Sequence, residues 1–380
     1  MGLSERIERW FDAVTLFDLK GNSSWIRIRT NMSDEVFKEG GPYHIKRVGP
    51  DKISMQMSVP ADADGLVGRN CPNDGCCPGY FKVKLGTGIT EGQLKAYCPY
   101  CRHEDEPGGF LTAAQVEYAK QIVLHEAIKG INEGIENALD LGPSGRKTYG
   151  GGMFSLEMSY KPSSLPPVVP PMEEVLRRDI TCPHCGLQHA VFGLATWCPD
   201  CGRDIFLNHL AKEFEAIRKM LSDVDRRREA LGARVAARDI ENALEDVVSI
   251  FEAAMRAMTI RKMKENGSSD DQIQEKLRKI GNKFQNVNLA REVCEDEFKV
   301  QLLQGLDPKQ IDSLRLTFEK RHPITHNLGI VDRKYLEKVR LGELEGRDVS
   351  VTPQDIIMVM DVGTKILENL HSYLFSNNSQ

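Results

Sequence analysis

The 380-residue sequence lacks the features that would take a protein into or across a membrane. No stretch approaches the roughly 20 consecutive apolar residues that a membrane-spanning helix needs. The first residues, MGLSERIERWFDAV, are charged and lack the apolar core of a secretory signal. The order Met-Gly-x-x-x-Arg also places Arg6 where a myristoylation signal has Ser or Thr. The sequence therefore predicts a cytoplasmic protein with no membrane partner.

An excess of positive charge is missing as well. The formal net charge is −5, so no global basic field draws the protein to nucleic acid, and any such contact must come from local patches. Disulfides are not expected, because thiols stay reduced in the cytosol. The chain nevertheless has 10 cysteines, which we attribute to metal binding. No internal repeat of 20 to 50 residues stands out beyond the two cysteine units themselves.

Composition divides the chain into regions, and we expect an α+β multidomain fold. Residues 1–160 mix strand and helix patterns and contain a first cysteine unit over about 69–104. Residues 161–172 hold five of the 18 prolines, which predicts an extended linker at a domain boundary. Residues 173–202 form a second small cysteine unit of β character. Residues 203–380 read as helical almost throughout and predict an all-α bundle.

Periodic patterns predict several individual elements. We expect strands at Ser23–Thr30, Lys52–Val59 and Phe154–Tyr160, and helices at Thr112–Leu139 and Ala233–Glu265. The longer helix carries one apolar stripe made of Ile240, Leu244, Val247, Phe251, Met255 and Met258. Two more helices are expected to begin at Asp307-Pro308 and at Thr352-Pro353, where an N-cap residue precedes a proline at the first helical position.

The second cysteine unit, CPHCGLQHAVFGLATWCPDCG, has the spacing of a zinc ribbon. Its two Cys-x2-Cys pairs are Cys182 with Cys185 and Cys198 with Cys201. Each pair can wrap a tight turn that directs two thiolates at one tetrahedral ion, and the apolar HAVFGLATW between them suits a short hairpin. Two redox motifs would need a βαβ context that is absent. We expect a structural zinc with a closed coordination shell.

The first cysteine unit predicts a second structural zinc. Cys98 and Cys101 form a clear Cys-x2-Cys pair, whereas Cys71 has two possible partners, Cys76 and Cys77. The Cys71-x4-Cys76 spacing falls within the usual range, so we assign Cys76 and leave Cys77 as a spare. The segments YFKVKL and QLKAY would supply the strands of this ribbon.

Other side chains near the ribbons allow two interpretations. Lysines and aromatic residues of the first ribbon suit phosphate contact and base stacking: Lys82, Lys84, Lys95, Tyr80, Phe81 and Tyr97. Alternatively, the aromatic residues pack the ribbon and the lysines are only solvated. We expect His103, His184 and His189 to be exposed loop residues and Cys294 to be a small buried hydrophobe.

The segment FEKRHPITHNLG places Arg321 and His326 five positions apart. On a straight helix two such side chains diverge by about 140° around the axis. Pro323 lacks an N–H and disfavours helical geometry at His322. We therefore expect the helix to end or kink near Arg321, with His326 in a new turn, so that the two side chains no longer share an axis.

This Arg-x4-His spacing near the end of a helical region, with His322 directly after the arginine and Asn327 after the histidine, resembles the HEPN superfamily. The resemblance covers about residue 203 to the C-terminus and leaves residues 1–202 unexplained. It implies a HEPN-like helical bundle, a metal-independent endoribonuclease with Arg321 and His326 catalytic and His322 accessory, and a homodimer with a composite site. It also implies a toxin-like or antiphage defence effector, with an unknown trigger or antitoxin partner.

The chemistry of these residues fits RNA cleavage. RNA carries its own nucleophile, the 2′-OH, so histidine can serve as the base and arginine can hold the phosphate without a catalytic metal. The alternative is structural: Arg321 satisfies a helix end and the histidines cap or pack locally. The protein would then be a non-enzymatic zinc-ribbon adaptor for nucleic acid or protein that dimerises through its helical domain. The run Arg226–Arg228 reads as a solvated helix face or as part of an RNA-binding surface.

Overall fold

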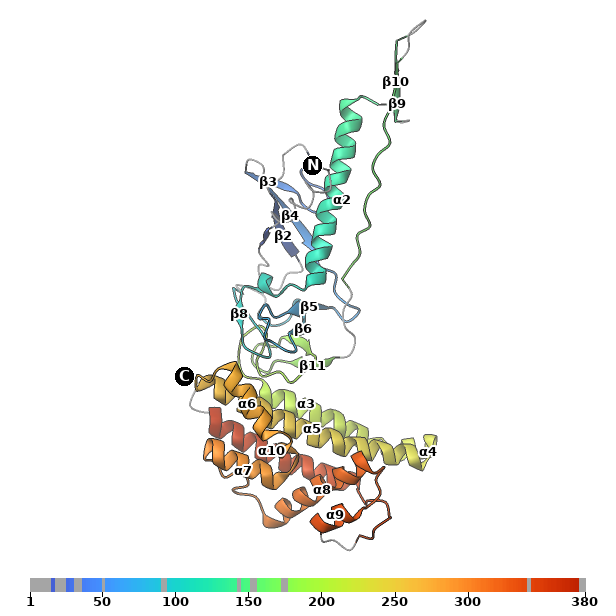
Figure 1. The fold of residues 1–380 in the computed structure, drawn as a ribbon. Coiled ribbons are helices and arrows are strands. Elements are labelled where there is room, and N and C mark those ends of the chain that lie inside the picture. The colour runs from blue at the N-terminus through green and yellow to red at the C-terminus, as the bar shows by residue number, and fades with distance from the viewer. Residues whose placement is uncertain are drawn as a thin grey trace. The chain divides into compact units, whose positions relative to one another are not determined.

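The computed structural model describes residues 15–17, 25–30, 36–49, 52–89, 94–141, 145–150, 156–171, 177–339 and 343–375. The chain divides into two compact units, the first ending at Ile205 and the second beginning at Phe206. Unit one combines small sheets with one long helix, and unit two is helical (Figure 1). The expected mixed fold with a helical C-terminal region is therefore observed.

A four-stranded antiparallel sheet and helix α2 (Ala113–Ala138) build the first core of unit one. The strand order is β1-β2-β4-β3, with β1 at Thr15–Phe17, β2 at Trp25–Thr30, β3 at Lys46–Gly49 and β4 at Lys52–Ser58. Met55 and Met57 of β4 are buried in one cluster with Ile122 and Val123 of α2. Thr112 caps this helix as expected, in a reciprocal pair of hydrogen bonds with Gln115. The strand and helix predictions for this region are confirmed over the described residues, and residues 23 and 24 of the first expected strand lie outside them.

The backbone at Val36 approaches α2 so closely that position 130 of the helix must be a glycine. A Cβ atom added there would overlap the carbonyl oxygen of Val36. Substitution with any other residue would force the helix away from the segment that carries Phe37, which is buried in the same core.

The proline-rich segment is extended, as expected, and it lies along α2 (Figure 1). It follows a hairpin of β9 (Arg146–Tyr149) and β10 (Leu156–Ser159), which includes the described part of the strand expected at 154–160; residues 154 and 155 lie outside the described residues. The side chain of Asn132 donates to the carbonyl of Ser163 and accepts from its N–H, and Gln121 accepts from the N–H of Val169. The helix rises about 16 Å between Asn132 and Gln121, and an extended chain spans about 19 Å from Ser163 to Val169. The similar lengths let the segment bind α2 at both places.

Both cysteine units contribute to one antiparallel sheet. Its order is β11-β12-β6-β5, with β5 at Leu66–Asn70, β6 at Tyr80–Lys84, β11 at Arg178–Thr181 and β12 at Gln188–Val191. Strand β12 pairs with β6, so the two units share a sheet and a core that contains cysteines from both. The sequence places a proline-rich linker at residues 161–172 between the two cysteine units, and pairing of β12 with β6 joins these units in one sheet.

One detail of the ribbon prediction is wrong, and both segments expected to supply strands do so. The expected hairpin within HAVFGLATW does not form, because β12 pairs with β11 before it and with β6, while Trp197 makes an isolated bridge to Asp204. The segment QLKAY contributes β7 (Ala96–Tyr97), which pairs with β8 (Glu104–Asp105) in a separate two-stranded sheet. A short 3-10 helix, η1 (Pro107–Phe110), then leads to α2. The strand expected at YFKVKL is present as β6.

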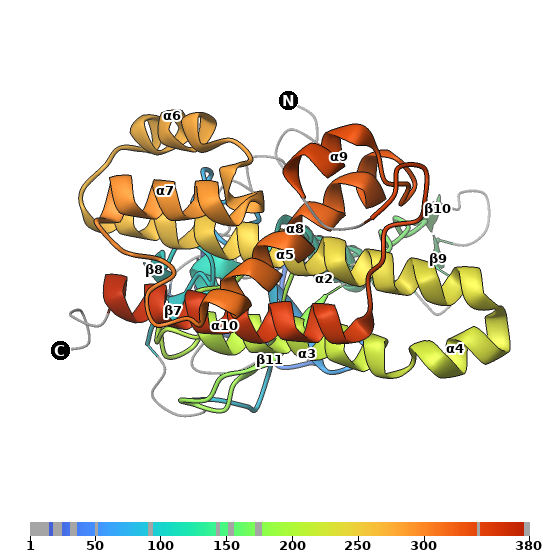
Figure 2. The ribbon, with the colours of Figure 1, turned by 90° about the horizontal axis from the view of Figure 1, so that it is seen from below.

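Unit two consists of helices around the central α5. Its elements are α3 (Phe206–Ser222), α4 (Val224–Leu231), α5 (Ala233–Glu265), α6 (Asp270–Ile280), η2 (Lys283–Gln285), α7 (Val287–Phe298), α8 (Pro308–His326), α9 (Arg333–Lys338) and α10 (Pro353–Phe375). Helix α5 packs against α3, α8 and α10, and α8 also crosses α10 (Figure 2). The predicted apolar stripe of α5 is entirely buried in this contact. None of the helices in the described part of the chain is long and apolar enough to cross a membrane.

Local capping sets the beginnings of α8 and α10. Asp307 accepts from the N–H of Lys309 and forms a reciprocal pair with Gln310, with Pro308 at the first helical position. Thr352 accepts from the N–H of Asp355, whose carboxylate accepts from the N–H of Thr352. Both predicted helix entries are confirmed, because the capping groups lie within three residues of each other.

Candidate metal centres and the arginine–histidine helix

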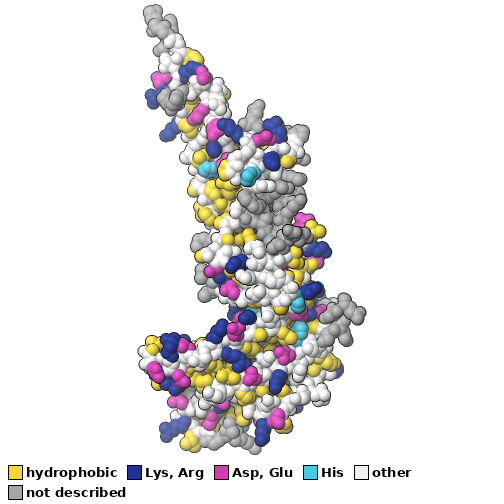
Figure 3. Space-filling view, turned by 180° about the vertical axis from the view of Figure 1, so that it is seen from behind, with side chains coloured by type: hydrophobic (Ala, Val, Ile, Leu, Met, Phe, Trp, Pro, Cys, Tyr) yellow, Lys and Arg dark blue, Asp and Glu magenta, His cyan; other side chains and the backbone are white. Residues whose placement is uncertain are grey.

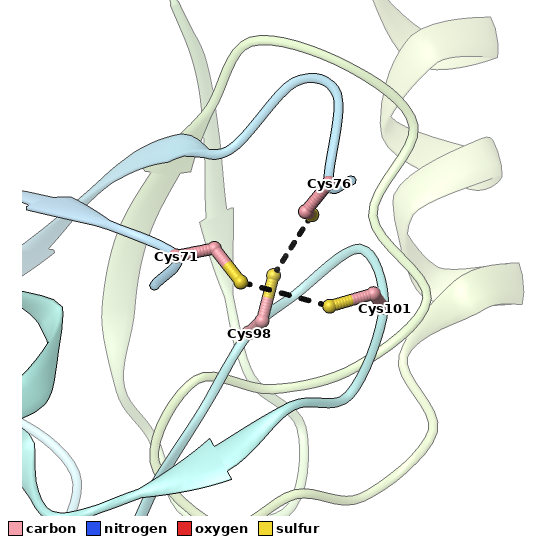
Figure 4. A group of neighbouring side chains, drawn as sticks. All are labelled: Cys71, Cys76, Cys98 and Cys101. Carbon is pink, nitrogen blue, oxygen red and sulfur yellow. Dashed lines mark hydrogen bonds between the residues drawn. The ribbon is translucent and has the colours of Figure 1, made fainter. Parts of the chain in front are cut away.

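Four cysteines of the first unit converge between two strand ends and the loops that follow them (Figure 4). The Sγ atoms of Cys71 and Cys101 lie 3.6 Å apart, and those of Cys76 and Cys98 also lie 3.6 Å apart. Zinc–sulfur bonds of about 2.3 Å in a tetrahedral site place the sulfur atoms about 3.8 Å from each other. The four thiols are therefore spaced to hold one ion of this size. Cys77, directly after Cys76, is exposed and outside the cluster.

A second cluster of four cysteines forms in the other ribbon. The Sγ atoms of Cys182 and Cys201 lie 3.8 Å apart, and those of Cys185 and Cys198 lie 3.6 Å apart. The turns that carry them end at glycines with left-handed backbones, Gly186 at φ 77° and Gly202 at φ 64°. Glycine suits both positions, because other residues are strained in this conformation.

Backbone amides also point at the sulfur atoms. The N–H of His184 donates to Cys182 Sγ at 3.4 Å, and the N–H of Asp200 donates to Cys198 Sγ at 3.4 Å. The N–H of Tyr100 donates to Cys98 Sγ at 3.5 Å in the first cluster. Hydrogen bonds to a thiolate favour its charged form, which is the form that binds a metal.

The thiols of each cluster shift one another's pKa values strongly. In the first, hydrogen bonds with Cys101 and Cys76, together with burial, hold the pKa of Cys98 well above its usual range. The pKa of Cys76 is raised to about 12, chiefly by its hydrogen bond with Cys101. Hydrogen bonds from Cys76 and Cys98 lower the pKa of Cys101 to about 2. Only a bound cation would let all four ionise, so each cluster has the donor set of a metal centre. Together they could hold two ions.

Several charged and aromatic side chains of the first ribbon are buried or paired, which limits their contact with nucleic acid. Lys82 is 1% exposed, and its Nζ lies 2.9 Å from the carboxylate of Asp62, while Phe81 is buried in the ribbon core. Lys95 is exposed and pairs with Glu104. Of the two interpretations of this ribbon, burial favours packing for Phe81 and Lys82, because neither side chain is exposed to a nucleic acid.

The three histidines near the cysteines differ in burial. His184 is exposed and His103 half-buried, but His189 is 1% exposed because it lies in β12, the strand between β11 and β6. The expectation of an exposed loop residue is wrong for His189. Cys294 is fully buried in α7, and burial raises the pKa of its thiol to about 12, as expected of a small hydrophobe.

Helix α8 contains the whole arginine–histidine segment. It runs without interruption from Pro308 to His326, with Pro323 inside it, so the expected helix end near Arg321 is wrong. Pro323 and Ile324 are buried in the bundle. A proline inside a helix costs about 3 kcal/mol, and burial of these two side chains offsets that cost. Within one chain, Arg321 and His326 therefore remain on different faces of one helix.

Arg321 is held by a chain of polar contacts within unit two. Its guanidinium donates to Gln285 Oε1 at 2.8 Å, and Gln285 in turn donates to Glu252 Oε2 of α5 at 2.7 Å. The Nε atom of Arg321 is buried and has no hydrogen-bond partner. Gln285 and Glu252 carry no motif in the sequence, and only the fold brings η2 and α5 beside α8. The guanidinium is thus fixed in position and keeps donor capacity.

His322 and His326 lie on the same side of α8. Their ring centroids are 5.0 Å apart, as expected for residues one turn apart. His326 is exposed and His322 half-buried. Partial burial lowers the pKa of His322, and the positive charges of Lys334, His326 and Lys338 act in the same direction, against Asp332. His322 is consequently neutral at physiological pH and able to accept a proton.

Each arginine of the run in α4 has an acidic partner. Arg226 pairs with Asp223, Arg227 with Asp239 and Arg228 with Asp225. Positive and negative side chains are interspersed over the face in Figure 3, without a broad area of one sign. This arrangement fits a solvated helix face, because neighbouring carboxylates weaken the attraction of the arginines for phosphate.

The chain thus combines a mixed α/β unit bearing two four-cysteine clusters with a separate helical unit. Comparison with protein families, curated proteins and solved structures finds no match for this chain. A proposal of function therefore rests on the motifs of the sequence and on the chemistry and geometry of these sites.

Proposed function

We propose that this protein is a metal-independent endoribonuclease of the HEPN type, which uses Arg321 and His326 to cleave RNA. The observation that supports this most is the fixed guanidinium of Arg321 on the helix that also carries two histidines with rings 5.0 Å apart. His326 is exposed at the end of α8, where a polymer can reach it. The resemblance of the segment to HEPN domains supplies the reaction class.

The reaction needs a base, an acid and a cation. His326 removes the proton of the ribose 2′-OH, the 2′-oxygen bonds to the adjacent phosphorus, and the bond to the 5′-oxygen breaks. Arg321 stabilises the charge that develops on the phosphate oxygens. The proton that His326 has taken then passes to the departing 5′-oxygen, and neutral His322 is the accessory group that can accept and relay it. The products are a 2′,3′-cyclic phosphate and a 5′-hydroxyl, and DNA is not cleaved because it lacks the nucleophile.

A composite site accounts for the positions of the two main residues. Side chains about 140° apart around one helix cannot both face one phosphate. Two chains that bring their α8 helices together would place Arg321 of one copy near His326 of the other. The proposal therefore includes a homodimer formed through unit two.

We assign the two metal ions a structural role. Four cysteines at sulfur separations of 3.6 to 3.8 Å suit tetrahedral zinc, which prefers thiolates. Each closed shell leaves no position for substrate, so both ions would stabilise unit one and take no part in catalysis. The ribbon unit would then recognise RNA or a trigger, in keeping with a toxin-like or antiphage role.

Cleavage of RNA in EDTA tests the assignment. Zinc-loaded wild-type protein is expected to cut RNA to 2′,3′-cyclic phosphate ends in the chelator, while Arg321→Ala and His326→Ala lose at least 100-fold in rate. His44→Ala, which removes an exposed histidine of unit one, is the matched control and should retain full activity. Zinc content is measured before and after the assay, since loss of the structural ions would unfold unit one.

Mixing two inactive variants tests the composite site. Arg321→Ala and His326→Ala chains, combined at equal concentration, should recover activity in heterodimers that contain one intact pair. If His326→Ala alone cuts RNA as fast as wild type, the catalytic assignment is wrong. Absence of recovery on mixing, with dimers present, contradicts the composite site.

One observation favours the non-enzymatic alternative. The contact of Arg321 with Gln285 is also what a purely structural arginine would make inside a bundle. The protein would then be an adaptor for nucleic acid or protein that dimerises through its helical unit. Such a protein would bind a partner without cleaving RNA, and Arg321→Ala would lower the stability of unit two instead of an activity.

A further inference from the structure

The two histidines of α8 are spaced as a pair of metal ligands on one helix face. His322 and His326 are separated by three residues, which places their side chains about 40° apart around the axis and about 6 Å apart along it. Their ring centroids lie 5.0 Å apart. Two histidines at this spacing on one helix face form the metal-binding part of the His-x3-His motif of zinc enzymes.

We infer that His322 and His326 form a two-histidine surface site for a divalent transition-metal ion such as Zn²⁺ or Ni²⁺, distinct from both cysteine clusters. Imidazole nitrogen is a ligand that these ions prefer. Both side chains bind through one nitrogen each, and water fills the remaining positions. Both histidines belong to unit two, whereas the cysteines of the two clusters belong to unit one.

The surroundings of the histidine pair are mixed in charge. Lys334 and Lys338 lie near enough to act on His322 and disfavour a cation, while Asp332 acts the other way. The pair also occupies the last turn of α8, where carbonyl groups give the helix end a negative potential that favours cations.

A metal at this site would regulate the proposed nuclease. The nitrogen of His326 that binds the ion can no longer accept the 2′-OH proton. Zn²⁺ or Ni²⁺ is therefore expected to inhibit cleavage and EDTA to restore it. This consequence rests on the proposed function, whereas binding of the ion does not.

Equilibrium dialysis with Ni²⁺ tests the site independently of activity. The zinc-loaded full chain, without a polyhistidine tag, should bind one Ni²⁺ per chain while retaining its zinc. His322→Gln and His326→Gln should each lose this binding by at least tenfold in affinity, and His44→Gln should bind as wild type. Zinc released into the dialysate is measured in parallel, so that exchange into the cysteine clusters is distinguished from binding at α8.

Either of two results overturns the inference: no Ni²⁺ bound beyond the zinc content, or Ni²⁺ binding that is equal in wild type and both glutamine variants. Binding that depends on His322 and His326 in a protein that never cleaves RNA would support the site and contradict the proposed nuclease. Inhibition of cleavage by Ni²⁺ in the His322→Gln variant, at the wild-type concentration, would contradict regulation through the pair.

Discussion

Lys82 and Asp62 form a buried ion pair in the ribbon sheet, with 2.9 Å between Nζ and the carboxylate oxygen and with side chains 1% and 15% exposed. Arg177 also contacts Asp62, at 3.4 Å. The lysine lies in the central strand β6, so its position inside the fold depends on this carboxylate.

Removing Asp62 should therefore cost more than removing Lys82. Asp62→Asn leaves an uncompensated buried ammonium and should lower the free energy of unfolding of unit one by about 3 kcal/mol. Lys82→Met should change it by less than about 1 kcal/mol, because Arg177 still pairs with Asp62 and the apolar stem is retained. Urea unfolding followed by tryptophan fluorescence measures unit one alone, since Trp10, Trp25 and Trp197 all belong to it. Equal losses in the two variants would contradict the argument.

The same ion pair predicts a pH dependence. Burial raises the pKa of Asp62, but hydrogen bonds from Lys82 and from the amides of Leu66 and Asp64 outweigh it, and the pKa falls below its ordinary value of 3.8. A carboxyl with a depressed folded-state pKa stabilises the fold above its unfolded pKa and loses this contribution as the pH falls through the folded one. Stability of unit one should therefore decrease below about pH 4, and less so in Asp62→Asn.

Substitution of neighbouring cysteines tests which thiol belongs to the first cluster. Cys76→Ser should lower the zinc content from two ions per chain to one, because the first cluster loses a ligand that lies 3.6 Å from Cys98 Sγ. Cys77→Ser should retain both ions, since Cys77 is exposed and outside the cluster. Zinc is measured by elemental analysis of the dialysed proteins. The reverse pattern would assign Cys77 as the ligand.

Local sequence patterns predicted the features that depend on neighbouring residues. The N-caps at Asp307 and Thr352 and the buried stripe of α5 are set within a few residues or one helix face, and the sequence contains that information. The two Cys-x2-Cys pairs of the second ribbon are local in the same sense. These predictions were confirmed because tertiary packing did not oppose them.

Tertiary packing accounts for the predictions that were wrong or left open. Pro323 alone favours a helix end, but its burial with Ile324 keeps α8 continuous. Lys82 reads as a surface residue, but pairing of β12 with β6 makes β6 a central strand with both faces covered. That pairing joins segments about a hundred residues apart, and nothing in either segment specifies its partner. Gln285 was missed as a contact of Arg321 for the same reason.

Removal of the metal should unfold the ribbon core and leave unit two intact. The shared core of the ribbons contains cysteines of both clusters. Loss of the ions leaves these buried thiols without the metal that holds them together, and the pKa of Cys98, for example, is then well above its usual range. Treatment with a thiol-reactive mercurial and EDTA should change the fluorescence of Trp197, next to Cys198, and preserve most helical ellipticity. Cys294→Ala, which removes the buried cysteine of unit two, should keep both ions and respond in the same way. A cooperative loss of all helical signal would contradict independent units.

Gln285 should act as a positioning residue for Arg321 if the proposed nuclease is correct. Gln285→Ala removes the acceptor that lies 2.8 Å from the guanidinium and leaves Glu252 without its donor. A hydrogen bond to a charged group contributes about 1.5 kcal/mol, so kcat for RNA cleavage should fall about tenfold with KM nearly unchanged. Glu252→Gln, which keeps a hydrogen-bonding side chain beside Gln285, should lose less than threefold. A purely structural contact would instead lower the melting temperature of unit two in Gln285→Ala and leave kcat of the folded protein at the wild-type value.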